Sequence, residues 1–127
     1  MPGPLRPALP HADITDRILR AFFTVHTRMG HGFAESLYER ALDIELSRLG
    51  LPLERQVPFK ARYDGHLIGE YRADLIVSGL VLVEVKAVPK LADAHRGQVV
   101  NYLRIAELPL GLLLNFGPSA EVRRVVM

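Results

Sequence analysis

The feature that most constrains the fold is a short apolar run, residues 80–88, that contains two charged side chains. The run is almost entirely aliphatic and β-branched, which is typical of a strand buried on both faces of a sheet. Glu84 and Lys86 lie within it, and strand alternation places them on the same face. Because a buried charge costs several kcal/mol unless it is paired or coordinated, these two side chains indicate a chemical role.

A second strand is predicted just upstream, over residues 69–77, and the two strands should form an antiparallel hairpin. A two-residue loop would keep Asp74 away from Glu84, whereas a three-residue loop, residues 78–80, places the two opposite each other. We expect the three-residue loop. Facing carboxylates repel, but a divalent cation between them reverses the sign of that interaction, and oxygen ligands suit Mg²⁺ or Mn²⁺.

The same residues allow a simpler interpretation. Glu84 and Lys86 could form an ion pair on the solvated face of an edge strand, with Asp74 at the surface. A D…ExK pattern is loose and arises often by chance. These three residues alone do not decide between a metal site and a surface ion pair.

Further motifs surround these residues in a fixed order. They are Gly32-Phe33-Ala34-Glu35-Ser36-Leu37-Tyr38 before Asp74, Glu84-Val85-Lys86 after it, then Gln98-Val99-Val100-Asn101-Tyr102 and Asn115-Phe116-Gly117. In order and spacing, from about residue 13 to residue 126, the chain resembles the PD-(D/E)XK nuclease superfamily and, within it, the small bacterial proteins known as the GxxExxY family. Ala73 stands where the superfamily name has a proline, which is not a metal ligand.

The resemblance implies a metal-dependent nuclease that hydrolyses phosphodiester bonds of nucleic acid, with DNA as the default substrate and RNA as the alternative. It implies that Asp74, Glu84, the Val85 carbonyl and Glu35 hold Mg²⁺ or Mn²⁺, and that Lys86 acts on the attacking water. For Glu35 a simpler explanation exists, because a glutamate in the first turn of a helix is favoured by the helix dipole alone.

Gln98 and Tyr102 are spaced by four residues on a predicted helix, so they share a face. Alone, such a pair is typical of a polar patch on an amphipathic helix. It resembles the Gln-x-x-x-Tyr motif of RecB-type nucleases, which implies that these side chains brace the catalytic lysine and contact the nucleic-acid backbone. His95, one turn earlier, is a candidate phosphate contact or a solvated histidine.

The predicted fold class is α/β, a mixed sheet flanked by helices. Apolar periodicity predicts helices over about 13–29, 34–49 and 91–108. A strand, helix, strand order from residue 80 to 116 implies a right-handed crossover and a parallel strand pair. With strands also at about 54–63 and 122–126, the element order is α-α-β-β-β-α-β-β, and the resemblance implies a restriction-endonuclease-like core.

At 127 residues the chain is expected to form one domain, residues 12–127, after a loose proline-rich tail, residues 1–11. The net charge of +2 permits a polyanionic partner without demanding one. The lack of cysteine excludes disulfides and thiolate metal sites. No apolar stretch reaches transmembrane length and no signal peptide is apparent, so we expect a cytoplasmic protein without a membrane partner.

Two other function classes remain open at this stage. The fold could serve as a nucleic-acid-binding or accessory module whose cleavage activity is weak or lost, because an intact motif does not prove turnover. The domain could also act mainly through protein contacts, as a homodimer formed by the apolar edge segment 122–127.

Overall fold

The computed structural model describes residues 11–127, so all but the last residue of the predicted tail lies outside the described residues. The element order α-α-β-β-β-α-β-β is confirmed. The elements are α1 (Ala12–Met29), α2 (Glu35–Arg48), β1 (Leu53–Tyr63), β2 (His66–Val77), β3 (Val81–Lys86), α3 (Asp93–Ala106), β4 (Leu110–Phe116) and β5 (Ala120–Val126). No helix among residues 11–127 is both long and apolar enough to cross a bilayer.

The strands form one sheet in the order β1-β2-β3-β4-β5, so β3 lies at its centre. All neighbouring strands are antiparallel except β3 and β4, which are parallel and joined through α3. The predicted parallel pair is therefore confirmed. Glu84 is only 5% exposed on this central strand, which contradicts its predicted alternative place on the solvated face of an edge strand.

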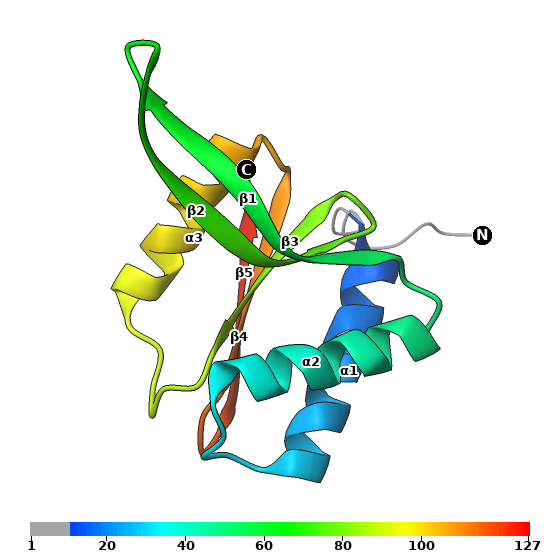
Figure 1. Ribbon diagram of the computed structural model, residues 1–127. Coiled ribbons are helices and arrows are strands. Elements are labelled where there is room, and N and C mark those ends of the chain that lie inside the picture. Colours follow the sequence, from blue (N-terminus) through cyan, green and yellow to red (C-terminus); the bar gives the residue numbers. More distant parts are fainter. Residues whose placement is uncertain (1–10) are drawn as a thin grey trace, which may run out of the picture.

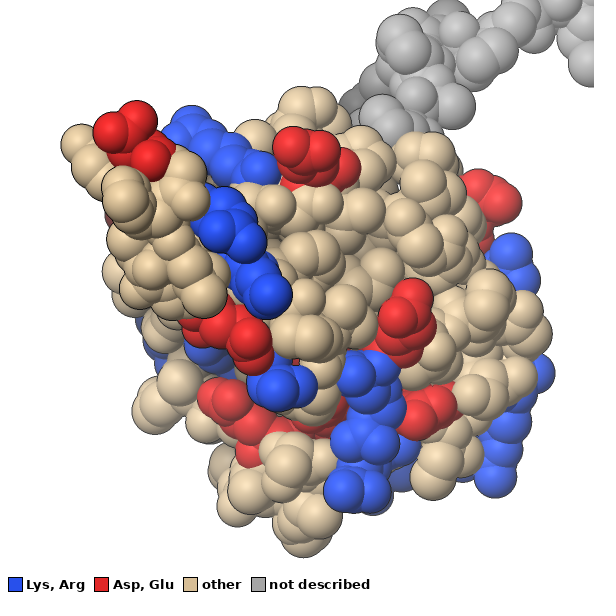
Figure 2. Space-filling view, turned by 45° about the horizontal axis from the view of Figure 1, so that its top comes forward, with Lys and Arg blue, Asp and Glu red and all other residues tan. Residues whose placement is uncertain are grey.

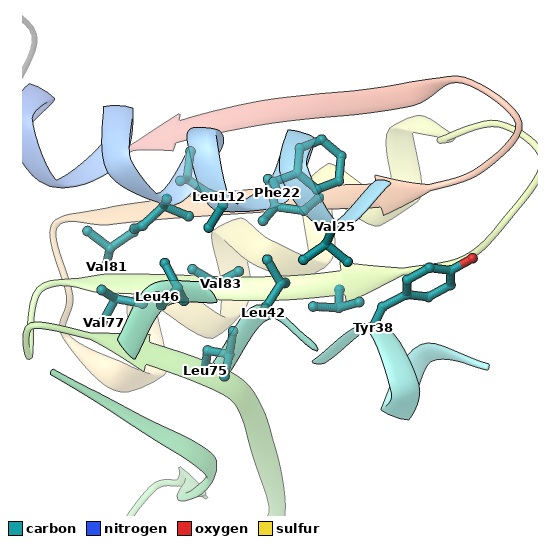
Figure 3. Close-up of a cluster of buried hydrophobic side chains, with 14 of the residues drawn as sticks. Phe22, Val25, Tyr38, Leu42, Leu46, Leu75, Val77, Val81, Val83 and Leu112 are labelled. Carbon is teal, nitrogen blue, oxygen red and sulfur yellow. The ribbon is translucent and has the colours of Figure 1, made fainter. Parts of the chain in front are cut away.

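The sheet separates two apolar clusters. Helices α1 and α2 cover one face and α3 covers the other, as Figure 1 shows. Alternate residues of β3 supply both clusters: Val83 and Val85 pack under α1 and α2, whereas Leu82 packs under α3. Figure 3 shows the larger cluster, where leucine, valine and aromatic side chains from both helices and the sheet interlock. This packing fixes β3 between two dry layers, as its sequence predicts.

Strands β1 and β2 continue beyond the rest of the sheet as a projecting hairpin, seen in Figure 1. Strand β2 pairs with β3 only through its last three residues, from Leu75 to Val77. Val77 pairs with Val81, which leaves the three residues 78–80 in the loop, as expected. Upstream of Leu75, β2 diverges from β3 and stays paired with β1 alone. The divergence opens the sheet beside the predicted carboxylates.

Candidate metal and nuclease site

The carboxylates of Asp74 and Glu84 meet where β2 and β3 separate. The last pair of the ladder joins Leu75 with Val83, so the same register sets Asp74 opposite Glu84, one step beyond it. There the Asp74 side chain replaces a ladder partner: its Oδ2 accepts a hydrogen bond of 2.8 Å from the backbone N–H of Val85. This bond fixes the aspartate against β3.

Glu84 is a carboxylate that is almost fully buried and has an oxygen without a hydrogen-bond partner among the described residues. Only 5% of the residue is exposed, and its Oε1 has no hydrogen-bond partner among the described residues. Burial, together with the neighbouring Asp74 carboxylate, raises the pKa of Glu84 to about 9, against a smaller opposing effect of Lys86. An unpartnered buried carboxylate oxygen is costly, so its retention indicates that a positively charged ligand or a proton satisfies it.

Lys86 is the last residue of β3 and shares the α3-side face with Glu84. It is half-buried. No ion pair joins Lys86 to an acidic residue within the described residues 11–127. Its ammonium group therefore remains available for chemistry next to the two carboxylates.

A third carboxylate approaches Asp74 from α2. Glu39 is 5% exposed, and the Gln56 amide nitrogen donates to both of its oxygens, at 2.9 and 3.1 Å. The same nitrogen lies 3.4 Å from Oδ1 of Asp74. Arg55 Nε lies 3.5 Å from Oε1 of Glu39. Gln56 thus links an acidic residue of α2 to the predicted site on the sheet.

The backbone at Gln56 explains how this link arises. Its φ of 51° is left-handed, a conformation that costs a residue other than glycine about 1–3 kcal/mol. Leu53 packs in the cluster under α1 and α2, whereas Val57 packs under α3, although a regular strand would place residues four apart on one face. The strand therefore changes faces here. Arg72 donates to the Gln56 carbonyl at 3.2 Å, which stabilises the distortion.

Glu35, predicted as a metal ligand, lies elsewhere in α2. It is the first residue of the helix and is exposed, and no side-chain hydrogen bond or ion pair joins it to another of the described residues. Tyr38, by contrast, is fully buried and its hydroxyl donates to the Gly30 carbonyl at 2.7 Å. The carboxylate of α2 that reaches toward Asp74 is Glu39, which the sequence analysis missed.

Helix α3 brings one of its three predicted residues to the carboxylates. Tyr102 stacks on Tyr71 with ring centroids 3.9 Å apart. The pKa of the Tyr102 hydroxyl is raised, mainly by burial and next by the charge of Glu84. Gln98 is exposed, and its side chain forms no hydrogen bond with another residue of the part described. His95 accepts a hydrogen bond at Nδ1 from the Ala92 N–H, 2.9 Å away, which stabilises the start of the helix.

The segment after Lys86 is held by an amide of β4. Asn115, which pairs with Lys86 in the parallel ladder, has no exposed surface. Its Oδ1 accepts from the Val88 N–H at 2.9 Å, and its Nδ2 donates to the Val88 carbonyl and to Glu121, each at 3.0 Å. Glu121 also accepts from the Leu91 N–H at 3.0 Å. These bonds fix the chain between Lys86 and α3.

We expect Gly117→Ala to destabilise the protein by about 1–3 kcal/mol, the usual cost of overpacking. A Cβ at this position would lie 2.5 Å from the Val88 carbonyl oxygen, which is backbone and cannot rotate away. The matched control is Gly69→Ala, because a Cβ there meets nothing within 4 Å. Urea unfolding of both variants measures the difference, and equal stabilities would show that the Val88 segment yields easily.

The residues present fit a hard divalent cation. No three Asp, Glu, His or Cys side chains among residues 11–127 form a complete metal-binding group. Mg²⁺, however, commonly binds through one or two carboxylates and keeps several waters. Asp74 and Glu84 supply two carboxylates, one of them with the buried, unpartnered oxygen. An added positive charge would satisfy that oxygen and relieve the repulsion between the two groups.

The face of the molecule that includes the projecting hairpin carries mixed charge. Figure 2 shows Lys and Arg side chains along the projecting hairpin and on the body below it, with Asp and Glu side chains between them. This face therefore has no uniformly basic surface. Electrostatic attraction of a polyanion would be correspondingly modest and sensitive to salt.

Comparison with known proteins identifies the family. The model of the PD-(D/E)XK nuclease superfamily matches residues 12–125, nearly the whole chain. No curated protein sequence matches the chain. The crystal structure of SSO0001 has a similar fold, with a TM-score of 0.53 and 17% sequence identity over 89% of this chain. The match covers 65% of that structure's chain. The mixed sheet and its element order fit the restriction-endonuclease-like fold.

Proposed function

Because the chain belongs to the PD-(D/E)XK nuclease superfamily, we propose that it is a metal-dependent nuclease that hydrolyses phosphodiester bonds of DNA. Within the superfamily we assign it to the GxxExxY family, on the motif at residues 32–38. The observation that carries the proposal is the meeting of the half-buried Asp74 with the buried Glu84, one of whose oxygens has no hydrogen-bond partner among residues 11–127. Lys86 lies two residues after Glu84, on the same face of β3.

Asp74, Glu84 and the Val85 carbonyl would hold Mg²⁺ or Mn²⁺, with a further carboxylate from α2. Such an ion, when bound, supplies Lewis acidity at the phosphate and lowers the pKa of a coordinated water. The main-chain hydrogen bond from Val85 keeps the Asp74 carboxylate oriented. Burial of Glu84 strengthens the electrostatic interactions that its carboxylate makes.

Lys86 would orient or deprotonate the attacking water and offset negative charge in the transition state. Its place at the end of β3 suits this role, because the Asn115 network fixes the chain that follows. Gln98 and Tyr102 would brace the lysine and contact the nucleic-acid backbone. His95 would contact a phosphate through Nε2, since its Nδ1 already accepts from Ala92.

The carboxylate that α2 contributes can be identified by a matched pair of variants. We expect Glu39→Gln to weaken Mn²⁺ binding and to reduce cleavage at least tenfold, because Glu39 is buried and linked to Asp74 through Gln56. Glu35→Gln, which removes the same charge from an exposed position, should change both by less than about twofold. Calorimetric titration measures how tightly each variant binds Mn²⁺. The reverse ranking would assign the role to Glu35.

The function is tested by incubating purified protein with linear, circular and single-stranded DNA. Each substrate is combined with Mg²⁺, with Mn²⁺ or with chelator. The proposal predicts cleavage that requires a divalent ion. Binding of DNA without cleavage would favour a nucleic-acid-binding module of the same fold, and cleavage that persists in chelator would contradict metal dependence.

A further inference from the structure

We propose that the side-chain amide of Gln56 competes with the cation for the carboxylates of Asp74 and Glu39 and withdraws when the metal binds. This inference rests on the proposed function and extends it, because it describes how the site is kept assembled before the metal arrives. Gln56 lies on β1, outside every motif that the sequence analysis used.

The contacts of the amide nitrogen carry the inference. Nε2 faces three carboxylate oxygens, two of Glu39 and one of Asp74, at distances between 2.9 and 3.4 Å. An amide N–H₂ group has only two hydrogens and carries a partial positive charge. It therefore offsets the repulsion between two carboxylates that come from different elements, α2 and β2. Arg55 assists at Glu39, where its Nε is 3.5 Å from Oε1.

A second, independent observation indicates that the site binds a cation. Glu84 is 5% exposed, and its Oε1 has no hydrogen-bond partner among residues 11–127. The Gln56 amide contacts Glu39 and Asp74 but forms no hydrogen bond with this oxygen. The amide thus contacts two of the three carboxylates, while one oxygen of the third has no hydrogen-bond partner among these residues.

The Gln56 amide can leave the two carboxylates by a movement of its side chain alone, while the backbone stays in place. The left-handed conformation of Gln56, with φ of 51°, directs its side chain toward Glu39 and Asp74. Its carbonyl is held by Arg72 at 3.2 Å. A cation and an N–H donor compete for the same carboxylate lone pairs, so metal binding at Asp74 and Glu39 displaces the amide. Rotation about the side-chain bonds of Gln56 suffices for this.

The variant that tests the inference is Gln56→Asn. Asparagine tolerates the left-handed conformation, so the backbone is preserved, but its shorter side chain cannot reach the two carboxylates. We expect three results from calorimetric titration with Mn²⁺ and from thermal unfolding with chelator or Mn²⁺. The variant binds Mn²⁺ about three- to tenfold more tightly, the size of one net hydrogen bond. Its Tm is lower in chelator, and its Tm rises more on adding Mn²⁺.

Glu54→Gln, an exposed change two residues away on the same strand, is the control and should leave all three quantities unchanged. Weaker Mn²⁺ binding by Gln56→Asn would overturn the inference, since it would make Gln56 a metal ligand. Unchanged binding would also overturn it, because the amide would then not compete with the cation. If the wild-type protein takes up no Mn²⁺, both the inference and the proposed function fail. Uptake without DNA cleavage would contradict the proposed function alone.

Discussion

Lys86→Ala is expected to reduce metal-dependent DNA cleavage by about 10²- to 10³-fold, or roughly 3–4 kcal/mol, while Mn²⁺ uptake persists. Asp74→Asn is expected to reduce cleavage similarly and to weaken Mn²⁺ uptake as well. The difference follows from the geometry. Asp74 is fixed to β3 by the Val85 N–H and faces Glu84, whereas the ammonium of Lys86 has no acidic partner within residues 11–127.

The matched control for the lysine is Lys90→Ala, which removes the same charge from an exposed position four residues later. It should retain cleavage within about twofold of wild type, allowing for a small change in long-range attraction. Single-turnover assays at saturating Mn²⁺ separate a loss of chemistry from a loss of binding. Full activity of either Lys86→Ala or Asp74→Asn would remove the enzyme assignment.

Glu84→Gln is expected to make the metal-free protein more stable above neutral pH and to flatten its pH dependence. Burial, reinforced by Asp74, raises the pKa of Glu84 from 4.5 to about 9. Folding therefore takes up a proton between these pH values. The stabilisation is complete below about pH 4.5 and is lost as the pH rises toward 9, by up to about 1.4 kcal/mol per pH unit. Glutamine cannot ionise, so the variant lacks this loss.

Urea unfolding in chelator at several pH values between 5 and 9 measures this effect. Glu70→Gln is the control, because the Glu70 side chain is 46% exposed on β2. Its pH dependence should follow that of the wild type. Parallel curves for wild type and Glu84→Gln would show that Glu84 ionises normally in the folded protein, and that its carboxylate is not buried beside Asp74 as described.

The sequence predicted the part of the site that depends on regular structure. A strand has a period of two, so Glu84 and Lys86 had to share a face. The aliphatic run around them required burial on both faces, which the central position of β3 confirms. The length of the loop then determined the register that places Asp74 opposite Glu84. Each of these inferences needed only local geometry.

The sequence did not predict the part that depends on an irregular strand. Strand β1 changes faces at a left-handed residue, Gln56, and no turn residue marks this position in the sequence. One signal for Glu39 was present and went unused. Glu39 is spaced by three from Leu42 and by seven from Leu46, two fully buried residues of α2, so it occupies a position on the apolar face of the helix. A charge there indicates a buried partner, as Glu84 does on β3.

The central claim is that Asp74 and Glu84 together hold a divalent cation. The most direct test is diffraction from crystals soaked in Mn²⁺, recorded so that the anomalous signal of manganese is measured. We expect one strong anomalous peak between these two carboxylates, within coordinating distance of the Val85 carbonyl. A structure with no peak there, or with the peak bound at another surface, would contradict it.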